Sequence, residues 1–450
     1  MNDEPTSPPS TAAQTLAGQA WLKKKWNLRN NPFPHTAIAR IGGNDLRENG
    51  LLYEPAVQAD QVREAMEKFV LGSAFSGLKF GYLWSRGSSP ADSDARGYGK
   101  SVLLQHVARL VNRDFGRSVY LLSELDDEDA AENPICSLVT SFDTAQVRSL
   151  GAALFAAVEY GVKFRTLEEP PLAQRLRQEL IDRIGTDDQR VLLKAVADEQ
   201  NALHGRTLGP PDERLLVALC GEDPTAVVEY LNSIKAATRS RNGAVFFATF
   251  LLYAAAAGMK HVLVCCDQLE DLASSNTAKS KRDLETERFR DVLVETQPMA
   301  DMVSIIVTMH PRAAMKIKNA WDQADLPSFE DTDANNRSTV TLPGLQDVEE
   351  ARKLLSKYMD AAVQPDSGRE PGSLHPLTED AVAVLLSHST RKPRDVLRMA
   401  HSVLEEAAAR NLEVVGVEQV RRLLDTITPV PHQEGLDSLI TAGVLDWSQG

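Results

Sequence analysis

The sequence lacks the features that would place it among disulfide-rich or zinc-binding proteins. Only four of its 450 residues are cysteines. They are Cys136, Cys220, Cys265 and Cys266, and they form no CxxC pair and no other metal-ligand spacing. This pattern excludes a disulfide-stapled scaffold and a cysteine-based zinc site. We therefore expect small, buried thiols in a reducing compartment.

Long apolar runs and targeting signals are also missing. The longest apolar stretch, 244–258, is shorter than the ~18–20 residues that cross a bilayer, and Lys260 and His261 follow it. The first residues lack the basic-then-apolar order of a secretory signal. The sequence also has no internal repeat of the kind that rod-like proteins contain. These absences predict a cytoplasmic protein that has no membrane partner.

Positive charge is in deficit. The chain has 49 Lys and Arg against 63 Asp and Glu, which gives a formal net charge of -14. This balance disfavours a protein that coats nucleic acid non-specifically, although local basic patches remain possible. With 43% hydrophobic and 25% charged residues the composition is ordinary for a globular protein. At ~100–200 residues per domain, the length predicts two or three domains.

Strand and helix patterns alternate along the middle of the chain. A strand-like run at 78–84 is followed by a glycine-containing loop, an amphipathic helix at 102–116 and a second predicted strand at 117–125. The alternation resumes with strands at 261–267 and 302–310. It predicts an α/β fold in which helices cover both faces of a parallel sheet. Several helical patterns with proline-rich breaks indicate a helical insertion at about 125–240.

The ends of the chain differ from this core, which we place at 56–339. Residues 1–20 are expected to be a disordered leader. Residues 21–55 form an arm in which Lys23, Lys24, Lys25 and Arg29 alternate with aromatic residues. These aromatics either pack on the main domain or, with the basic residues, contact nucleic acid or a partner. Helical patterns predict a small all-helical domain at 340–428. Residues 429–450 are a tail or part of a winged-helix-like element.

The loop before the first amphipathic helix has the composition of a phosphate-binding loop. Its core is ARGYGKS, residues 95–101. Such a loop needs glycines so that backbone N–H groups can wrap phosphates, a Lys for the β- and γ-phosphates, and a Ser or Thr for Mg²⁺. Candidate ATP-contacting residues are Gly97, Tyr98, Gly99, Lys100, Ser101 and Val102. The consensus would place another glycine at Asp94, whereas Gly87 ends the preceding strand.

The apolar strand at 261–267 ends in an acidic residue. We expect Asp267, with Ser101, to hold Mg²⁺. The residue that usually follows is a Glu that activates the attacking water, and this chain has Gln268. Either Glu270 takes over that task or hydrolysis is slow. Without the upstream loop, the same run would be a buried strand followed by a solvated acidic loop.

Two further segments supply polar groups for a nucleotide site. Thr308 ends the strand that we expect between the loop strand and the acidic strand, where it could contact the γ-phosphate or the water, with His310 as the alternative. An equally good interpretation is a β-branched Thr that simply suits a strand. In the helical domain, Arg394 follows Pro393 at a helix start and could contact the γ-phosphate. The neighbouring Arg391 and Lys392 could contact nucleic acid or form a solvated basic turn.

In this order, these segments resemble the AAA+ ATPases over roughly residues 50–428. The resemblance extends to the initiator-like clade of origin-recognition and loader ATPases and to bacterial relatives in transposition and phage defence. It is carried by ARGYGKS as Walker A, VLVCCDQLED as Walker B, IIVTMH as sensor one and TRKPRDVLR as sensor two. The resemblance implies ATP-dependent assembly into rings or filaments on DNA. It also implies an arginine finger from a neighbouring subunit, for which Arg312 and Arg337 are the candidates.

Three functions remain open at this stage. One is a Mg²⁺-dependent ATPase that oligomerises and acts with DNA and partner proteins in phage defence, transposition or repair. The second is a slowly hydrolysing nucleotide switch or signalling scaffold whose helical insertion binds a protein, and Gln268 and the acidic charge favour it. The third is a nucleotide-free structural module, which Asp94 and Gln268 would suit.

Overall fold

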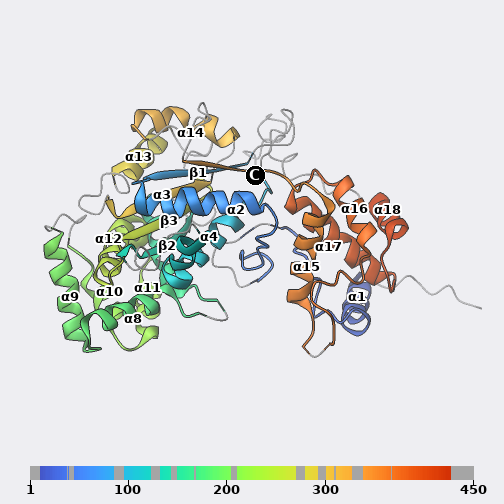
Figure 1. Ribbon diagram of the computed structural model, residues 1–450, viewed down its shortest axis with the longest axis horizontal. Helices are drawn as coiled ribbons and strands as arrows, with labels where there is room; N and C mark the ends of the chain where they lie inside the picture. The colour runs from blue at the N-terminus through green and yellow to red at the C-terminus, as the bar shows by residue number, and fades with distance from the viewer. Residues whose placement is uncertain are drawn as a thin grey trace, which may run out of the picture. The chain divides into compact units, whose positions relative to one another are not determined.

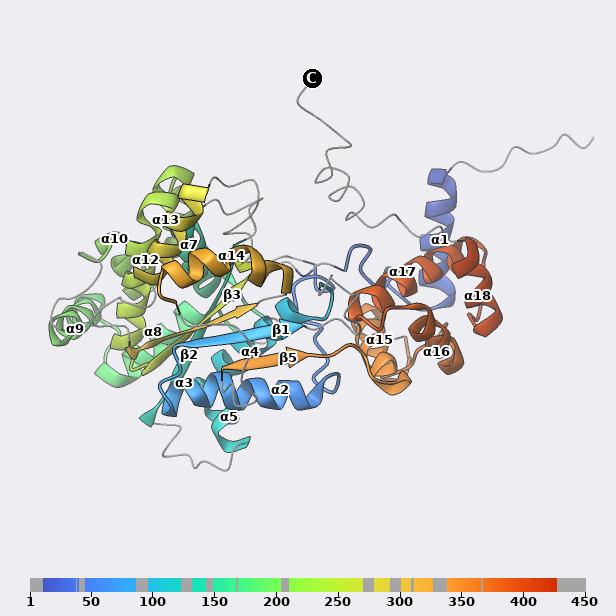
Figure 2. The same ribbon diagram turned by 90° about the horizontal axis from the view of Figure 1, so that it is seen from above.

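The chain divides into two compact units, which we describe separately. The computed structural model describes residues 11–37, 39, 45–85, 96–122, 132–142, 149–166, 169–203, 210–269, 279–291, 301–308, 311–326, 338–365 and 367–426. The first unit, called the α/β unit, comprises Ile38–Gln346 and Lys392–Arg394. The second, called the helical unit, comprises Met1–Ala37, Asp347–Arg391 and Asp395–Gly450. Figures 1 and 2 show the elements of each.

A parallel sheet is the centre of the α/β unit. Its strands are β1 (Phe80–Ser85), β2 (Ile135–Ser141), β3 (His261–Asp267), β4 (Val303–Thr308) and β5 (Thr339–Leu342). Five strands pair in the order β2-β3-β4-β1-β5, and every pair is parallel. The structure therefore confirms the predicted α/β fold with a parallel sheet. It also confirms that β4 lies between β1 and β3.

Successive residues of the strands face two different hydrophobic cores. Val262, Val264 and Cys266 belong to one buried cluster, whereas Leu263 and Cys265 belong to the other. This period of two is the pattern of a strand that is buried on both faces. It explains why β3 reads as a continuous apolar run rather than as an alternation of apolar and polar residues.

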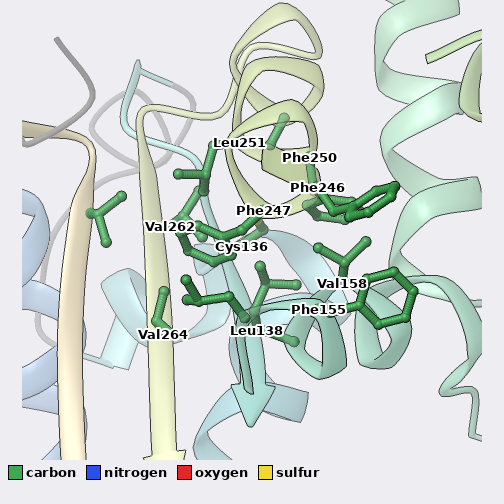
Figure 3. Close-up of a cluster of buried hydrophobic side chains, with 14 of the residues drawn as sticks. Cys136, Leu138, Phe155, Val158, Phe246, Phe247, Phe250, Leu251, Val262 and Val264 are labelled. Atoms are coloured by element: carbon green, nitrogen blue, oxygen red, sulfur yellow. The ribbon is translucent and has the colours of Figure 1, made fainter. Parts of the chain in front are cut away.

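Helices cover both faces of the sheet. One face packs on α7 (Leu150–Lys163), α12 (Ala236–Ala256), α13 (Lys279–Phe289) and α14 (Pro311–Gln323). Figure 3 shows Cys136 and Leu138 of β2 packed against phenylalanines of α7 and α12. The other face packs on α2 (Ala59–Ala65), the π-helix η1 (Met66–Leu71), α3 (Gly72–Phe75), α4 (Lys100–Asp114) and α5 (Arg117–Leu122). The predicted helix at 56–76 is thus built from three consecutive helical segments.

The second strand lies elsewhere than the sequence predicts. The segment predicted as a strand, 117–125, forms α5 at Arg117–Leu122, and the strand is β2, inside the stretch predicted to be wholly helical. Leu121 is 49% exposed on α5. By contrast, every residue of β2 except its last, Ser141, is buried. Cys136 and Leu138 of β2 belong to one hydrophobic core and Ile135 and Val139 to the other, so β2 is covered on both faces although it is an edge strand.

A group of helices extends the unit beyond β2. It comprises α7, α12 and the four between them, α8 (Leu172–Ile184), α9 (Gln189–Ala202), α10 (Glu213–Cys220) and α11 (Pro224–Ser233). Local capping defines several of their starts, because Ser149, Asp188, Asp212 and Asp223 each accept a hydrogen bond from a backbone N–H of the helix that follows. Leu180, Leu192 and Leu231 are fully buried and join this helical layer to the main core.

The helical unit contains the first part of the N-terminal arm, up to Ala37. Its helices are α1 (Thr11–Lys25), α15 (Val348–Ala362), α16 (Glu379–His388), α17 (Pro393–Ala409) from Asp395 onward, and α18 (Val417–Thr426). Trp26, Leu28 and Phe33 of the arm are at most 1% exposed. The Trp26 indole N–H donates to the carbonyl of Glu413 at 3.2 Å, and Leu28 forms an antiparallel bridge with Val363. Trp26 and Phe33 therefore pack within the helical unit, whereas Tyr53, near the end of the arm, packs in a core of the α/β unit.

Two further observations concern the first residue of α1 and the question of a membrane-crossing helix. Helix α1 begins at Thr11, inside the segment for which the sequence predicts a disordered leader. Across the described ranges, no helix combines the length and the apolar character that a membrane crossing requires.

Candidate functional site

The carboxyl ends of three neighbouring strands bring the candidate residues to one edge of the sheet. Leu83 of β1 is in register with Thr308 of β4, and Val307 of β4 is in register with Cys266 of β3. By this register Thr308 and Asp267 lie at the same level, and Ser85 lies two residues further along β1. In open parallel sheets, ligands bind outside this edge.

The described part of the glycine loop leads directly into α4. Gly97 and Gly99 have φ of 90° and 94°, which side chains other than glycine adopt only with strain. Gly99 caps α4, and its carbonyl accepts the first helical hydrogen bond, from the N–H of Leu103 at 2.9 Å. The loop thereby places the backbone N–H groups of the first turn, with their positive partial charge, at the sheet edge.

Lys100 and Ser101 are the first two residues of α4. The Lys100 ammonium donates to the Ser85 hydroxyl at 2.6 Å, so it lies at the end of β1. Ser101 and Val102 are half-buried in the same turn. Tyr98 is fully buried in the core beside α4, and this burial anchors the loop. The candidate loop residues thus join the end of β1 to the start of α4, which is the arrangement that phosphate binding requires.

Asp267 and Thr308 form a buried hydrogen-bonded pair. The Thr308 hydroxyl donates to Asp267 Oδ1 at 2.8 Å, and these residues are 2% and 3% exposed. The backbone N–H of Gln268 donates to the same Thr308 oxygen at 3.0 Å. A single hydroxyl therefore fixes both the carboxylate and the residue after it.

Gln268 has a constrained conformation. Its φ of 55° lies in the left-handed region, which is unfavourable for a residue with a side chain. Its side-chain oxygen accepts a hydrogen bond from the Ser141 hydroxyl at the end of β2, at 3.2 Å. Because β2 lies on the opposite side of β3 from β1, this bond holds the amide toward the edge strand.

The thiols next to Asp267 are unsuited to chemistry. Cys265 and Cys266 are buried, as are Cys136 and Cys220, and all four are free. Burial raises the pKa of Cys265 to about 12. Burial also raises the pKa of Cys266, and the neighbouring Cys265 and Asp267 add to that rise. All four therefore act as small hydrophobic residues, as predicted.

The start of α17 groups with the α/β unit. The backbone N–H of Arg394 donates to the carbonyl of Gly97 at 3.2 Å, and a Cβ added to Gly97 would lie 3.0 Å from Arg394 Cβ. Lys392 Nζ lies 5.5 Å from the centre of the Tyr98 ring. Arg391 belongs to the helical unit and has a φ of 60°. Arg394, predicted as a nucleotide-binding residue, thus contacts the glycine loop.

Several predicted residues lie outside the described part of the chain. They are Gly87, Asp94, Glu270, His310, Arg337 and the tail 429–450, and of Arg312 only the backbone, in α14, is described.

Sequence reasoning missed two polar residues of the site. Ser85 is the last residue of β1 and contacts Lys100, and Ser141 is the last residue of β2 and contacts Gln268. A polar residue at the end of an apolar strand was the available signal for Ser85. Ser141 was hidden because the segment containing it was assigned to the helical insertion.

Ser101 and Asp267 are the candidate protein ligands for a nucleotide-bound Mg²⁺ ion. Within the described ranges, no group of three or more His, Cys, Asp and Glu residues could hold a metal ion. Mg²⁺ usually takes one or two protein ligands, with phosphates and waters completing its shell. The hydroxyl of Ser101 and the carboxylate of Asp267 satisfy that smaller requirement.

Comparison with known proteins gives limited similarity. No protein-family model and no curated protein matches the chain. Two solved structures of the ORC2 protein from Aeropyrum pernix are similar to it, one of ADPNP–ADP complexes and one of the ADP form. The first has 10% sequence identity and a TM-score of 0.41 over 90% of this chain and 73% of that one. The second has 12% identity and a TM-score of 0.41 over 88% and 72%.

Proposed function

We propose that the chain is an ATP-binding AAA+ ATPase of the initiator-like clade. The single observation that carries the proposal is the Thr308–Asp267 hydrogen bond at the carboxyl edge of the sheet, with Thr308 on the strand that pairs with β1, which leads into the glycine loop. A buried carboxylate held by a polar neighbour at this edge suits a Mg²⁺-nucleotide better than a purely structural role. A structural carboxylate would more simply be replaced by an apolar residue.

Each loop residue has a role in this proposal. The backbone N–H groups from Gly97 to Val102 would wrap the phosphates, and Lys100 would leave Ser85 to contact the β- and γ-phosphates. Ser101 and Asp267 would hold Mg²⁺, which would neutralise phosphate charge during transfer. Arg394, whose backbone bonds to Gly97, would place a guanidinium near the γ-phosphate.

Hydrolysis needs a group that positions or deprotonates water. Thr308, fixed against Asp267, is suited to orient that water, with His310 as the alternative. Gln268 is a weak substitute for a glutamate, because an amide cannot take a proton at neutral pH. We propose that Glu270 supplies the carboxylate.

We further propose that the protein self-associates into a ring or filament and acts with DNA and partner proteins, in phage defence, transposition or repair. Arg312 and Arg337 are the candidates for a finger that completes a neighbour's site. The arm supplies a candidate DNA contact, because Lys23 and Lys24 are exposed while Trp26 and Phe33 are buried. Those aromatic anchors would hold the two charges in fixed positions.

The second candidate is a slowly hydrolysing nucleotide switch or signalling scaffold. The bond between Ser141 and the Gln268 amide favours it, because it holds that side chain away from β1 and the glycine loop. The γ-phosphate would then control domain closure rather than drive rapid turnover. The helices between β2 and β3 would bind the protein partner.

The deciding experiment measures ATP affinity, ATP turnover and oligomer size for the wild type and Lys100→Ala, with and without DNA. Lys260→Ala is the matched control, because this exposed lysine precedes β3 at the opposite edge of the sheet. The ATPase proposal expects turnover and assembly that Lys100→Ala abolishes and Lys260→Ala retains. Tight ATP binding without turnover would select the switch, and absence of ATP binding would reject both.

DNA binding has its own test. We expect Lys23→Ala with Lys24→Ala to weaken binding to a short duplex and to reduce the slope of log K against log salt by about 2. Lys194→Ala, which removes an exposed charge on α9, should leave the slope unchanged. An identical slope for the double variant and the wild type would remove the arm from the DNA interface.

A further inference from the structure

Gln58 occupies an unusual position at the start of α2. It is 3% exposed, and its φ and ψ of 60° and 40° lie in the left-handed region. Its carbonyl accepts the first hydrogen bond of the helix, from the N–H of Val62 at 3.0 Å. A buried polar side chain on a strained backbone is retained only where surrounding contacts compensate for both costs.

The side-chain amide of Gln58 bridges two segments that are distant in sequence. Its Nε2 donates to the carbonyl of Tyr98 at 3.4 Å and to the carbonyl of Pro343 at 2.5 Å. The two hydrogens of an amide nitrogen allow both bonds at once. A Cβ added to Gly99 would lie 4.0 Å from Gln58 Oε1, so the same side chain also lies beside the last glycine of the loop.

The two bridged segments have different tasks. Tyr98 lies between the two left-handed glycines of the loop that precedes Lys100. Pro343 follows β5, and residues 343–346, called the linker, are the last of the α/β unit before the helical unit resumes at Asp347. Gln58 therefore joins the backbone of the glycine loop to the backbone of the linker through one side chain.

We propose that Gln58 is a positioning residue that couples nucleotide binding in the glycine loop to the conformation of the linker. The coupling follows from the shared donor, because a shift of the Tyr98 carbonyl when the loop closes on phosphates changes the bond that the same nitrogen makes to Pro343. The inference rests on the proposed nucleotide-binding function. It adds a route by which nucleotide binding changes the linker, which connects the α/β unit to the helical unit.

The test compares ATP affinity and backbone hydrogen exchange in Gln58→Met and Gln58→Gly. Met keeps the length of the side chain without its donors, and Gly adopts the left-handed backbone without strain. Lys68→Met is the matched control, because Lys68 Nζ donates to the carbonyl of Thr339, on the strand β5 that precedes the linker, at 2.8 Å. Exchange is followed in peptides covering 96–102 and 338–347, with and without saturating ATP.

We expect both Gln58 variants to bind ATP about tenfold more weakly, as the loss of one to two hydrogen bonds would produce. At saturating ATP they should still show slowed exchange in the loop peptide but lose it in the linker peptide. Lys68→Met should retain both. The coupling is rejected if the Gln58 variants match the wild type in affinity and linker exchange, or if Lys68→Met loses linker protection equally. If the wild type does not bind ATP, the proposed function fails first, and the titration alone reveals it.

Discussion

Thr308 and Asp267 come from neighbouring parallel strands, and the hydroxyl of one donates to the carboxylate of the other at 2.8 Å. Both are almost completely buried at the carboxyl edge of the sheet. The same hydroxyl oxygen accepts the backbone N–H of Gln268. One threonine therefore determines where the carboxylate points and where the chain turns after β3.

Replacing Thr308 with Val should separate this role from simple strand packing. Val has the same shape but donates no hydrogen bond, so Asp267 loses a partner inside the protein. We expect ATP turnover to fall by about 10- to 100-fold, because a hydrogen bond to a charged group contributes roughly 1.5–3 kcal/mol. Thr308→Ser keeps the donor and should retain most of the turnover. Equal activities in the Val variant and the wild type would contradict the assigned role.

Gln268→Glu tests why hydrolysis would be slow. A carboxylate one residue after Asp267 can accept a proton from water, which an amide cannot. We expect single-turnover hydrolysis of bound ATP to accelerate by at least tenfold, with ATP affinity nearly unchanged. Gln268→Ala, which only removes the amide, should give no acceleration. If the Glu variant is no faster, Glu270 or another group already supplies the base.

The sheet was largely predictable because its signals are local. Runs such as VLVCCD and SIIVT are apolar on both faces, and only a buried parallel strand accommodates that pattern. The glycine loop was also predictable, since Gly97 and Gly99 stand directly before a strong amphipathic helix. β2 was missed because the aromatic and aliphatic residues of 117–125 gave a stronger strand signal than Ile135–Ser141.

The contacts within the site were not predictable, because they depend on strand order. Ser141 contacts Gln268 only because β2 pairs with β3. The local sequence of a strand does not predict which distant strand it pairs with. The bridge from Gln58 to Tyr98 and Pro343 likewise joins three segments far apart in sequence. Sequence patterns locate the elements, whereas these side-chain contacts arise only when the elements pack.

His261 should make stability fall in mildly acidic solution. Burial lowers its pKa to about 4, and the positive charge of Lys79 adds to this effect, against weaker opposing contributions from a hydrogen bond to the Lys260 backbone and from Asp301. Because the folded pKa lies below the ordinary value of 6.5, unfolding takes up a proton between those two values. Stability is therefore full above pH 6.5 and falls as pH decreases toward 4.

Urea unfolding at several pH values measures this loss. Between pH 6.5 and 5, the wild type should lose ~2 kcal/mol through this residue. His261→Gln can keep a hydrogen bond to Ser304, which lies 3.1 Å from the ring nitrogen, and has no proton to gain. Its stability should change much less over that interval. A parallel decrease in both proteins would assign the acid sensitivity to other groups.

The close crossing of α7 and α12 depends on two glycines. A Cβ added to Gly243 would lie 1.6 Å from the carbonyl oxygen of Gly151, and one added to Gly151 would lie 2.2 Å from the carbonyl oxygen of Ser240. Both obstacles are backbone atoms, so a rotated side chain cannot relieve them. Because these two helices cover one face of the sheet, any separation would open the core shown in Figure 3.

Gly243→Ala should therefore destabilise the protein by about 3 kcal/mol or more, at the upper end of the cost of overpacking. Gly72→Ala is the matched control, because it is also a helical glycine, with a φ of -59°, and its added Cβ would make ordinary contacts, with Leu78 at 3.6 Å and the Glu67 carbonyl oxygen at 3.8 Å. That variant should be as stable as the wild type or up to ~1 kcal/mol more stable, since Ala favours helix. The midpoints of urea unfolding of the two variants, measured under the same conditions, test this prediction. Equal midpoints for Gly243→Ala and Gly72→Ala would show that the helices cross with more space than their backbones indicate.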